Sequence, residues 1–136
     1  MTDTTNSEAS PPSSPVIVEL QADDLASLLH AGSAPTLVKF GASWCSPCRQ
    51  LAPQIDAFAK QQTNWRVVSV DIDLNPRSML RHRIRNIPCC VLFVNGEERS
   101  RHVGPMSLHD LKAWAHDALA SEPIHPRDAH PATPSA

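Results

Sequence analysis

The chain has 136 residues, of which 41% are hydrophobic and 19% are charged, and its formal net charge at pH 7 is −2. This length and composition are typical of one globular domain with its own hydrophobic core. A net charge so close to zero gives no reason to expect nucleic acid or a membrane surface as a partner. No apolar run has the length of a membrane span, and Met1–Pro15 has neither the basic start nor the apolar stretch of a signal peptide. We therefore expect a cytoplasmic protein.

The two ends of the chain differ in composition from its middle. Residues 1–15 and 122–136 are rich in Pro, Ser, Thr and Ala and contain almost no large apolar residues. Such segments bury too little apolar surface to offset the entropy that ordering costs. We therefore expect a disordered Pro/Ser-rich tail at 1–15, one folded domain at 16–121 and a disordered Pro/Ala-rich tail at 122–136.

The first half of the domain has the pattern of two strand-helix units. Val16–Val18 is apolar and favours a short strand, and Asp23–His30 spaces its leucines for one face of a helix. Thr36–Gly41 is typical of a buried strand, and Pro47–Gln62 spaces its large apolar residues for one buried helical face. Pro53 lies inside this second helix, where a missing N–H predicts a kink.

The second half begins with another strand and a short helix. Val67–Ile72 predicts the strand, and Asn75-Pro76 predicts the N-cap and first position of the helix. Cys90–Val94 and Glu98–Val103 then flank Asn95-Gly96, a strong signal for an antiparallel hairpin.

A final helix is indicated by a possible capping box at Ser107 and Asp110. The residues expected on its buried face are Leu108, Leu111, Trp114, Ala118 and Leu119. The predicted order is β-α-β-α-β-α-β-β-α.

The main chemical motif is Trp44-Cys45-Ser46-Pro47-Cys48, at the junction of the second strand and the second helix. A C-x-x-C inside a βαβ pattern is typical of a redox dithiol. The attacking species in disulfide exchange is a thiolate, which a helix N-terminus favours by its dipole and free N–H groups. This places the nucleophile at Cys45 and the resolving thiol at Cys48, one turn on. A purely structural disulfide is the alternative.

The element order and several motifs together resemble the thioredoxin family over about residues 16–120. Besides the C-x-x-C and Pro53, the motifs are Phe40-x-Ala42 before the active site, Asp73–Pro76, Ile87-Pro88 and Val103-Gly104. The resemblance implies an α/β thioredoxin fold, with a central mixed five-stranded sheet flanked by four helices.

The resemblance also implies a protein-disulfide reductase. Cys45 would form a mixed disulfide with a target protein, and Cys48 would release the reduced target. The implied electron donor is an NADPH-dependent thioredoxin reductase, and the chain is expected to be a monomer that binds no cofactor and no metal. Ile87 would pair with an extended substrate segment through its backbone, while a cis Pro88 would shield the dithiol and Trp44 would offer partners an aromatic surface.

Four positions depart from the family pattern. Lys39 stands where thioredoxins commonly have a buried acid, and Ser69 stands where many relatives have a lysine. The Lys39 amine would reach solvent, keep a charge that favours thiolates, or lose its proton on burial and act as a base. Asp71 is a candidate partner for it. Ser46 stands where most family members have glycine, and Gly41 stands where many have tryptophan. Both differences are expected to change the redox potential of the disulfide, but the sequence does not give the direction of the change.

Cys89 and Cys90 are adjacent and should point to opposite faces of a strand. Cys89, next to Pro88, is the better candidate to approach the dithiol, as a third redox thiol or a metal ligand. Packing in the core is the alternative for both residues.

The predicted site comprises the catalytic pair Cys45 and Cys48 and an environment of Trp44, Ser46, Pro47, Lys39, Ile87, Pro88 and Cys89. Four arginines precede the predicted substrate loop without an intervening acid, namely Arg77, Arg81, Arg83 and Arg85. They predict a preference for acidic partners that weakens with salt, unless they form only a solvated helix face. Two other functions remain open: a docking or chaperone-type module for one dedicated partner, and a metal-binding protein that uses cysteines.

Overall fold

The computed structural model describes residues 17–30, 32 and 34–120, so the predictions for the two tails lie outside the described residues. The elements follow the predicted order. The strands are β1 (Ile17–Glu19), β2 (Thr36–Gly41), β3 (Arg66–Asp71), β4 (Cys89–Val94) and β5 (Glu97–Val103). The helices are α2 (Leu25–Leu29), α3 (Ser46–Gln61), α4 (Pro76–Arg81) and α5 (Leu108–Ala120).

The strands form one five-stranded sheet in the order β1-β3-β2-β4-β5. β1 and β2 run parallel to β3, whereas β4 pairs antiparallel with both β2 and β5. The sheet is therefore mixed, as the family resemblance implied.

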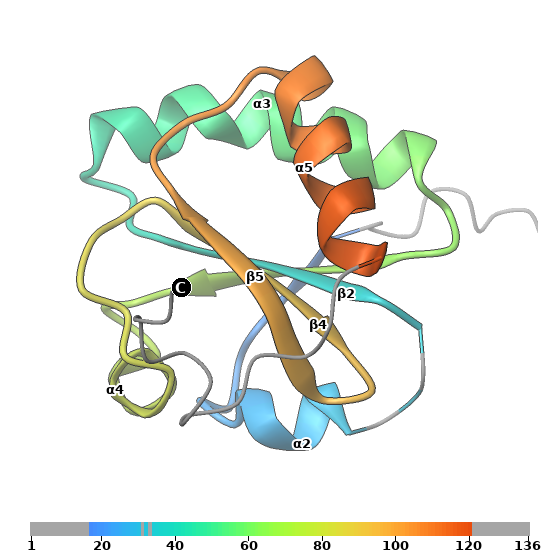
Figure 1. Cartoon of the computed structure of the whole chain (residues 1–136). Helices are drawn as coiled ribbons and strands as arrows, with labels where there is room; N and C mark the ends of the chain where they lie inside the picture. Colours follow the sequence, from blue (N-terminus) through green and yellow to red (C-terminus); the bar gives the residue numbers. More distant parts are fainter. Residues whose placement is uncertain (1–16, 31, 33, 121–136) are drawn as a thin grey trace, which may run out of the picture.

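Helices cover both faces of this sheet (Figure 1). α3 and α5 lie on one face, which we name the α3/α5 side, and α2 and α4 lie on the other, the α2/α4 side. Alternation along β2 sends Leu37 to the α3/α5 side, where it joins a cluster with Phe58 and Leu111. Phe40 and Val38 belong to the cluster on the α2/α4 side. Each face thus has its own buried core.

The β4–β5 hairpin forms where the sequence predicted it. Asn95 and Gly96 both have positive φ angles, 54° and 82°, which a two-residue hairpin turn of the right twist requires. The added Cβ of any other residue at position 96 would also lie 3.1 Å from the His30 ring. The turn therefore favours glycine for two reasons.

Helix capping differs from the prediction at α2 and α4. α2 begins at Leu25, later than expected, because Asp24 is its N-cap and accepts a hydrogen bond from Ser27 N. Asp23 has a positive φ of 53° and caps α4 instead, accepting from Ser78 N at 2.7 Å and Arg77 N at 2.9 Å. A carboxylate distant in sequence thus satisfies the free N–H groups at the start of α4.

Asn75 holds the N-cap position of α4 but does not cap it with its side chain. Its amide group instead donates to the backbone carbonyls of Leu20 and Asp71. Asn75 is fully buried, so it ties the start of α4 to β1 and β3 while Asp23 does the capping.

α5 is capped as predicted on one side, since Ser107 Oγ accepts a hydrogen bond from Asp110 N at 3.1 Å. Its buried residues are Leu111, Ala115 and Ala118. The prediction for Leu119 is wrong, because this side chain is 38% exposed. Eight residues after Leu111, it lies about 80° around the helix from that residue, at the margin of the buried stripe.

Candidate active site

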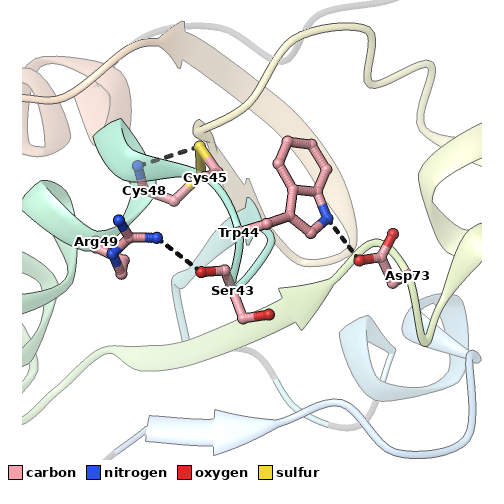
Figure 2. The surroundings of a disulfide bond; sticks show 6 residues. All are labelled: Ser43, Trp44, Cys45, Cys48, Arg49 and Asp73. Atoms are coloured by element: carbon pink, nitrogen blue, oxygen red, sulfur yellow. Dashed lines mark hydrogen bonds between the residues drawn. A yellow bond between two sulfur atoms is a disulfide. The ribbon is translucent and has the colours of Figure 1, made fainter.

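The two cysteines of the C-x-x-C motif lie between the end of β2 and the first turn of α3, and they form a disulfide. Cys45 is the N-cap of α3, and its Sγ accepts a hydrogen bond from Cys48 N at 3.2 Å (Figure 2). An N-cap acceptor satisfies one of the otherwise unpaired N–H groups of the first turn. The same N–H and the dipole of this 16-residue helix would stabilise a thiolate at Cys45 once the disulfide is reduced.

Little of either cysteine is exposed: Cys45 is 6% and Cys48 is 3% accessible. Both pack in a small cluster with Ala42, Ile72 and Ile87. Ser46 and Pro47 occupy the first helical positions and are exposed, so the residues between the two sulfurs face solvent. A target disulfide would therefore approach from the side of the Ser46-Pro47 turn.

Trp44 lies beside the disulfide and is 64% exposed. Its indole Nε1 donates to Asp73 Oδ2 at 2.7 Å, and the ring extends away from the sulfurs toward Asp73 (Figure 2). The hydrogen bond fixes the ring without burying it, which fits a contact surface better than a packing role. The sequence did not indicate this contact, because 29 residues separate the two side chains.

The Ile87–Pro88 peptide bond is cis, as predicted. Pro88 O accepts a hydrogen bond from Gly104 N at 2.8 Å, which ties the proline to the chain just after β5. Ile87 packs against the cluster that contains the disulfide. The structure thus brings Ile87, the first residue of the cis bond, to the dithiol.

Lys39 and Cys48 line the same cavity of about 210 Å³ between α3 and the edge of the sheet. The other residues of interest in its lining are Glu19, Gly41, Ser69 and Asp71. A Cβ atom on Gly41 would lie 3.2 Å from Cys48 Sγ and 3.9 Å from Lys39 Cε. The missing side chain of Gly41 therefore leaves a gap that separates the lysine from the second sulfur.

The predicted pairing of Lys39 with Asp71 does not form as an ion pair within the described part of the chain. In the sheet register Lys39 is opposite Ser69, and Asp71 is opposite Gly41, so the two charges are diagonal neighbours. Glu19, which pairs with Ser69 across β1 and β3, was not identified from the sequence. The position of Glu19 beside Ser69 follows from the order of the strands in the sheet, which cannot be derived from the sequence pattern.

Cys89 and Cys90 point to opposite faces, as predicted. Cys89 packs in the cluster on the α2/α4 side, so the structure does not bring it into the cluster around the disulfide. Cys90 pairs with Lys39 across β2 and β4 and packs on the α3/α5 side, the face that Cys48 also occupies. Cys89 was preferred because it follows Pro88 along the chain, whereas in the structure the two thiols differ in the face of the sheet on which each lies.

Burial controls the acidity of these two thiols. It raises the pKa of Cys90 to about 12, with a smaller contribution from neighbouring Cys89. It also raises the pKa of Cys89. Among residues 17–30, 32 and 34–120, no group of three His, Cys, Asp or Glu side chains is arranged to hold a metal ion.

The four predicted arginines are all exposed. Arg77 and Arg81 flank a surface groove on α4 that Asp23 and Asp24 also line. Hydrogen bonds from Ser27 lower the pKa of Asp24, and Arg81 and Arg77 contribute to this effect. Part of the charge of these two arginines is thus balanced within the chain, whereas Arg83 and Arg85 lie closer in sequence to Ile87.

Comparison with known proteins agrees with this geometry. A family model described as Thioredoxin matches residues 16–117, which include all five strands, the helices α2, α3 and α4, and most of α5. The chain belongs to the thioredoxin family. It is 37% identical to the thioredoxin of Rickettsia conorii over 86 residues, which are 62% of this chain and 82% of that protein.

Further relatives are also thioredoxins. That of Rickettsia bellii is 39% identical over 86 residues, with the same shares of both chains. Thioredoxin M5, chloroplastic, of Oryza sativa is 38% identical over 79 residues, which are 57% of this chain and 46% of the rice protein. As a thioredoxin, the protein is a protein-disulfide reductase, a thiol-disulfide oxidoreductase with a redox-active cysteine pair. None of its described helices is both long and apolar enough to cross a membrane.

Proposed function

We propose that this thioredoxin reduces disulfides of other proteins in the cytoplasm through distinct roles of Cys45 and Cys48. The Cys45 thiolate attacks one sulfur of the target disulfide, forming a mixed disulfide and releasing the other target sulfur as a thiolate. The Cys48 thiolate then attacks Cys45 Sγ, which forms the Cys45–Cys48 disulfide and releases the second target thiolate. Two electrons pass to the target, and its thiolates take protons from water.

The observation that carries this assignment is the position of Cys45 at the N-cap of α3, with Cys48 N donating to its sulfur at 3.2 Å. Only the first sulfur receives a hydrogen bond from the free N–H groups of the helix, so it is the better thiolate and the better leaving group. Family membership suggests that an NADPH-dependent thioredoxin reductase returns the disulfide to the dithiol.

Target proteins are proposed to bind across Trp44, Ile87 and Pro88. The exposed indole supplies aromatic contact area, and the backbone of Ile87 is available to an extended segment of the target. Arg83 and Arg85 add positive charge to the segment that leads to Ile87, so acidic targets should associate faster at low salt.

Lys39 is proposed to favour the Cys48 thiolate through the gap left by Gly41. A cation about 8 Å from the sulfur, at an effective dielectric constant of about 20, stabilises an anion by about 2 kcal/mol, or roughly one to two pKa units. The two atoms that flank the missing Cβ of Gly41 are the Lys39 Cε and the Cys48 Sγ, so no side chain of residue 41 lies between them. Charge stabilisation thus takes the place of the base that an acid would supply at position 39.

A trapping experiment tests the proposed function. Cys48→Ser leaves the nucleophile but removes the resolving thiol, so mixed disulfides with target proteins should accumulate in a cell lysate. The captured proteins are released by dithiothreitol and identified by mass spectrometry. The matched control is Cys45→Ser, which should capture nothing.

The captured set distinguishes the possible functions. Many different proteins would support a general reductase, whereas one dominant protein would support a docking module for a dedicated partner. Capture by Cys45→Ser but not by Cys48→Ser would reverse the proposed roles. If neither variant captures a protein and the purified chain contains zinc or iron, the metal-binding function is supported instead.

A further inference from the structure

The segment of residues 82–88 connects α4 to β4 and brings Ile87 to the disulfide. Its first residues are held by α4, since the N–H groups of His82, Arg83 and Ile84 donate to carbonyls of that helix. Within the described residues, Arg85, Asn86 and Ile87 make no hydrogen bond. The position of Ile87 therefore depends on how the two ends of the segment are anchored.

Arg101 on β5 anchors the first end. Its Nη2 donates to His82 O at 2.9 Å and its Nη1 to Arg83 O at 3.3 Å. The guanidinium is itself held by Glu98, with Nε at 2.7 Å and Nη2 at 2.8 Å from the two carboxylate oxygens. This bidentate pairing fixes the plane of the guanidinium, which a lysine would not provide.

The two carbonyls that Arg101 binds lie where the chain reverses direction. His82 is the C-cap of α4, and Arg83 has a φ of 56°, a left-handed conformation that is uncommon outside glycine and asparagine. The carbonyls at a helix C-terminus lack partners within the helix. Arg101 supplies these hydrogen-bond donors from β5. It therefore fixes the turn that sets the direction of the rest of the segment.

β5 also anchors the other end of the segment. Val103 pairs with Cys89, and Gly104 N donates to Pro88 O at 2.8 Å. Arg101 and Gly104 are three residues apart along the chain, so one short stretch holds both ends of the segment. Arg85, Asn86 and Ile87, which make no hydrogen bond, lie between these two anchored ends.

We propose that Arg101, oriented by Glu98, is a positioning residue that fixes the substrate-facing segment 82–88 against the dithiol. The proposal rests on the proposed function, in which Ile87 and Pro88 contact the target protein. Without Arg101 the segment would have to be ordered each time a target binds, and this cost weakens binding without changing the attack of Cys45. Small disulfides that need no contact with the segment would react as before.

Kinetics on two substrates test the proposal. For Arg101→Met we expect a KM for insulin disulfides about three- to tenfold higher with kcat nearly unchanged. The rate constant for 5,5′-dithiobis(2-nitrobenzoate), a small disulfide, should stay within about twofold of the wild-type value. Glu98→Gln should raise the KM less, and Arg101→Lys should restore only part of the loss. Lys60→Met removes an exposed charge from α3 and serves as the control.

Amide hydrogen exchange supplies a readout independent of activity. The hydrogen-bonded amides of His82, Arg83 and Ile84 should exchange faster in Arg101→Met than in Lys60→Met, while the amides of β2 stay protected. Equal losses on both substrates, or unchanged exchange of the segment, would overturn the proposal. If Arg101→Met does not fold, Glu98→Gln is measured in the same way. If the wild-type protein fails to reduce insulin, the proposed function fails, while the exchange data still decide whether Arg101 holds the segment.

Discussion

Two pairs of cysteines lie within this domain, and their surroundings differ in kind. Cys45 and Cys48 are three residues apart at the start of a helix, where both sulfurs reach one another and one receives a backbone hydrogen bond. Cys89 and Cys90 are adjacent on a central strand, where alternation sends them to opposite cores. Neither of the latter forms a disulfide.

The comparison shows that closeness along the chain is a poor guide to thiol chemistry. Local backbone geometry decides whether two sulfurs can meet, and the polarity around each sulfur decides whether it ionises. One pair lies at a helix end beside a cavity whose lining includes Lys39 and Asp71, whereas burial keeps the other pair as neutral thiols.

The largest expected difference between the pairs is in alkylation rate. In the reduced native protein at pH 7, iodoacetamide should modify Cys45 at least about a thousandfold faster than Cys90, because a thiol with a pKa of about 12 is almost never ionised at that pH. Mass spectrometry of the digested protein measures each site. In denaturant all four cysteines should react, and modification of Cys89 or Cys90 at the Cys45 rate in the native protein would contradict the comparison.

The next effect is on stability. Cys90→Ala should lower the free energy of unfolding by about 1–2 kcal/mol, because it opens space between α3, α5 and the sheet. Cys89→Ala should have an effect of similar size on the other core, and both variants should keep disulfide reductase activity. Urea unfolding and insulin reduction are the measurements. A stable Cys89→Ala variant that has lost activity would instead identify Cys89 as a third redox thiol.

A smaller effect distinguishes the surroundings of Cys48 from those of the buried pair. Lys39→Met should raise the pH at which the reduction rate is half-maximal by about one unit, because the lysine cation no longer favours the Cys48 thiolate. Lys39→Asp should move this pH further in the same direction, and Lys60→Met should not move it. Identical pH profiles for the wild-type protein and Lys39→Asp would exclude a role for Lys39 at the thiols.

The smallest expected effect is a pH dependence of stability on the α2/α4 side. Burial lowers the pKa of His82, with a further contribution from Arg81 and Arg101 that outweighs Glu98. The unfolded chain, where histidine titrates near about 6.5, then binds more protons than the folded chain. The contribution of His82 to stability is therefore complete above about pH 6.5 and decreases as the pH falls toward the lower folded pKa.

Urea unfolding between pH 5 and pH 7.5 measures this decrease. His82→Leu should flatten the curve, because a leucine side chain cannot bind a proton in either the folded or the unfolded state. His109→Leu, at an exposed position on α5, is the control and should leave the slope as it is. An unchanged slope in His82→Leu would show that other groups cause the pH dependence.

Much of the fold was predictable because its signals are local. β2 has the predicted bounds, and the β4–β5 turn follows from the backbone freedom of Asn95 and Gly96. Cys45 could be placed at the start of a helix because the strand before it and Pro47 after it mark the junction, whereas its N-cap hydrogen bond came from the structure. These features involve neighbouring residues, whose conformations depend on their own side chains.

The sequence by itself therefore determined the order of elements, the C-x-x-C pair and the likeness to thioredoxins. Only the tertiary structure decided that Asp23 caps α4, that Asp73 holds Trp44, and that Arg101 anchors the segment before Pro88. It also decided that Cys90, not Cys89, shares a face of the sheet with Lys39. Such contacts join residues on different elements, and hydrophobic periodicity along one element specifies which face is buried but not which partner covers it.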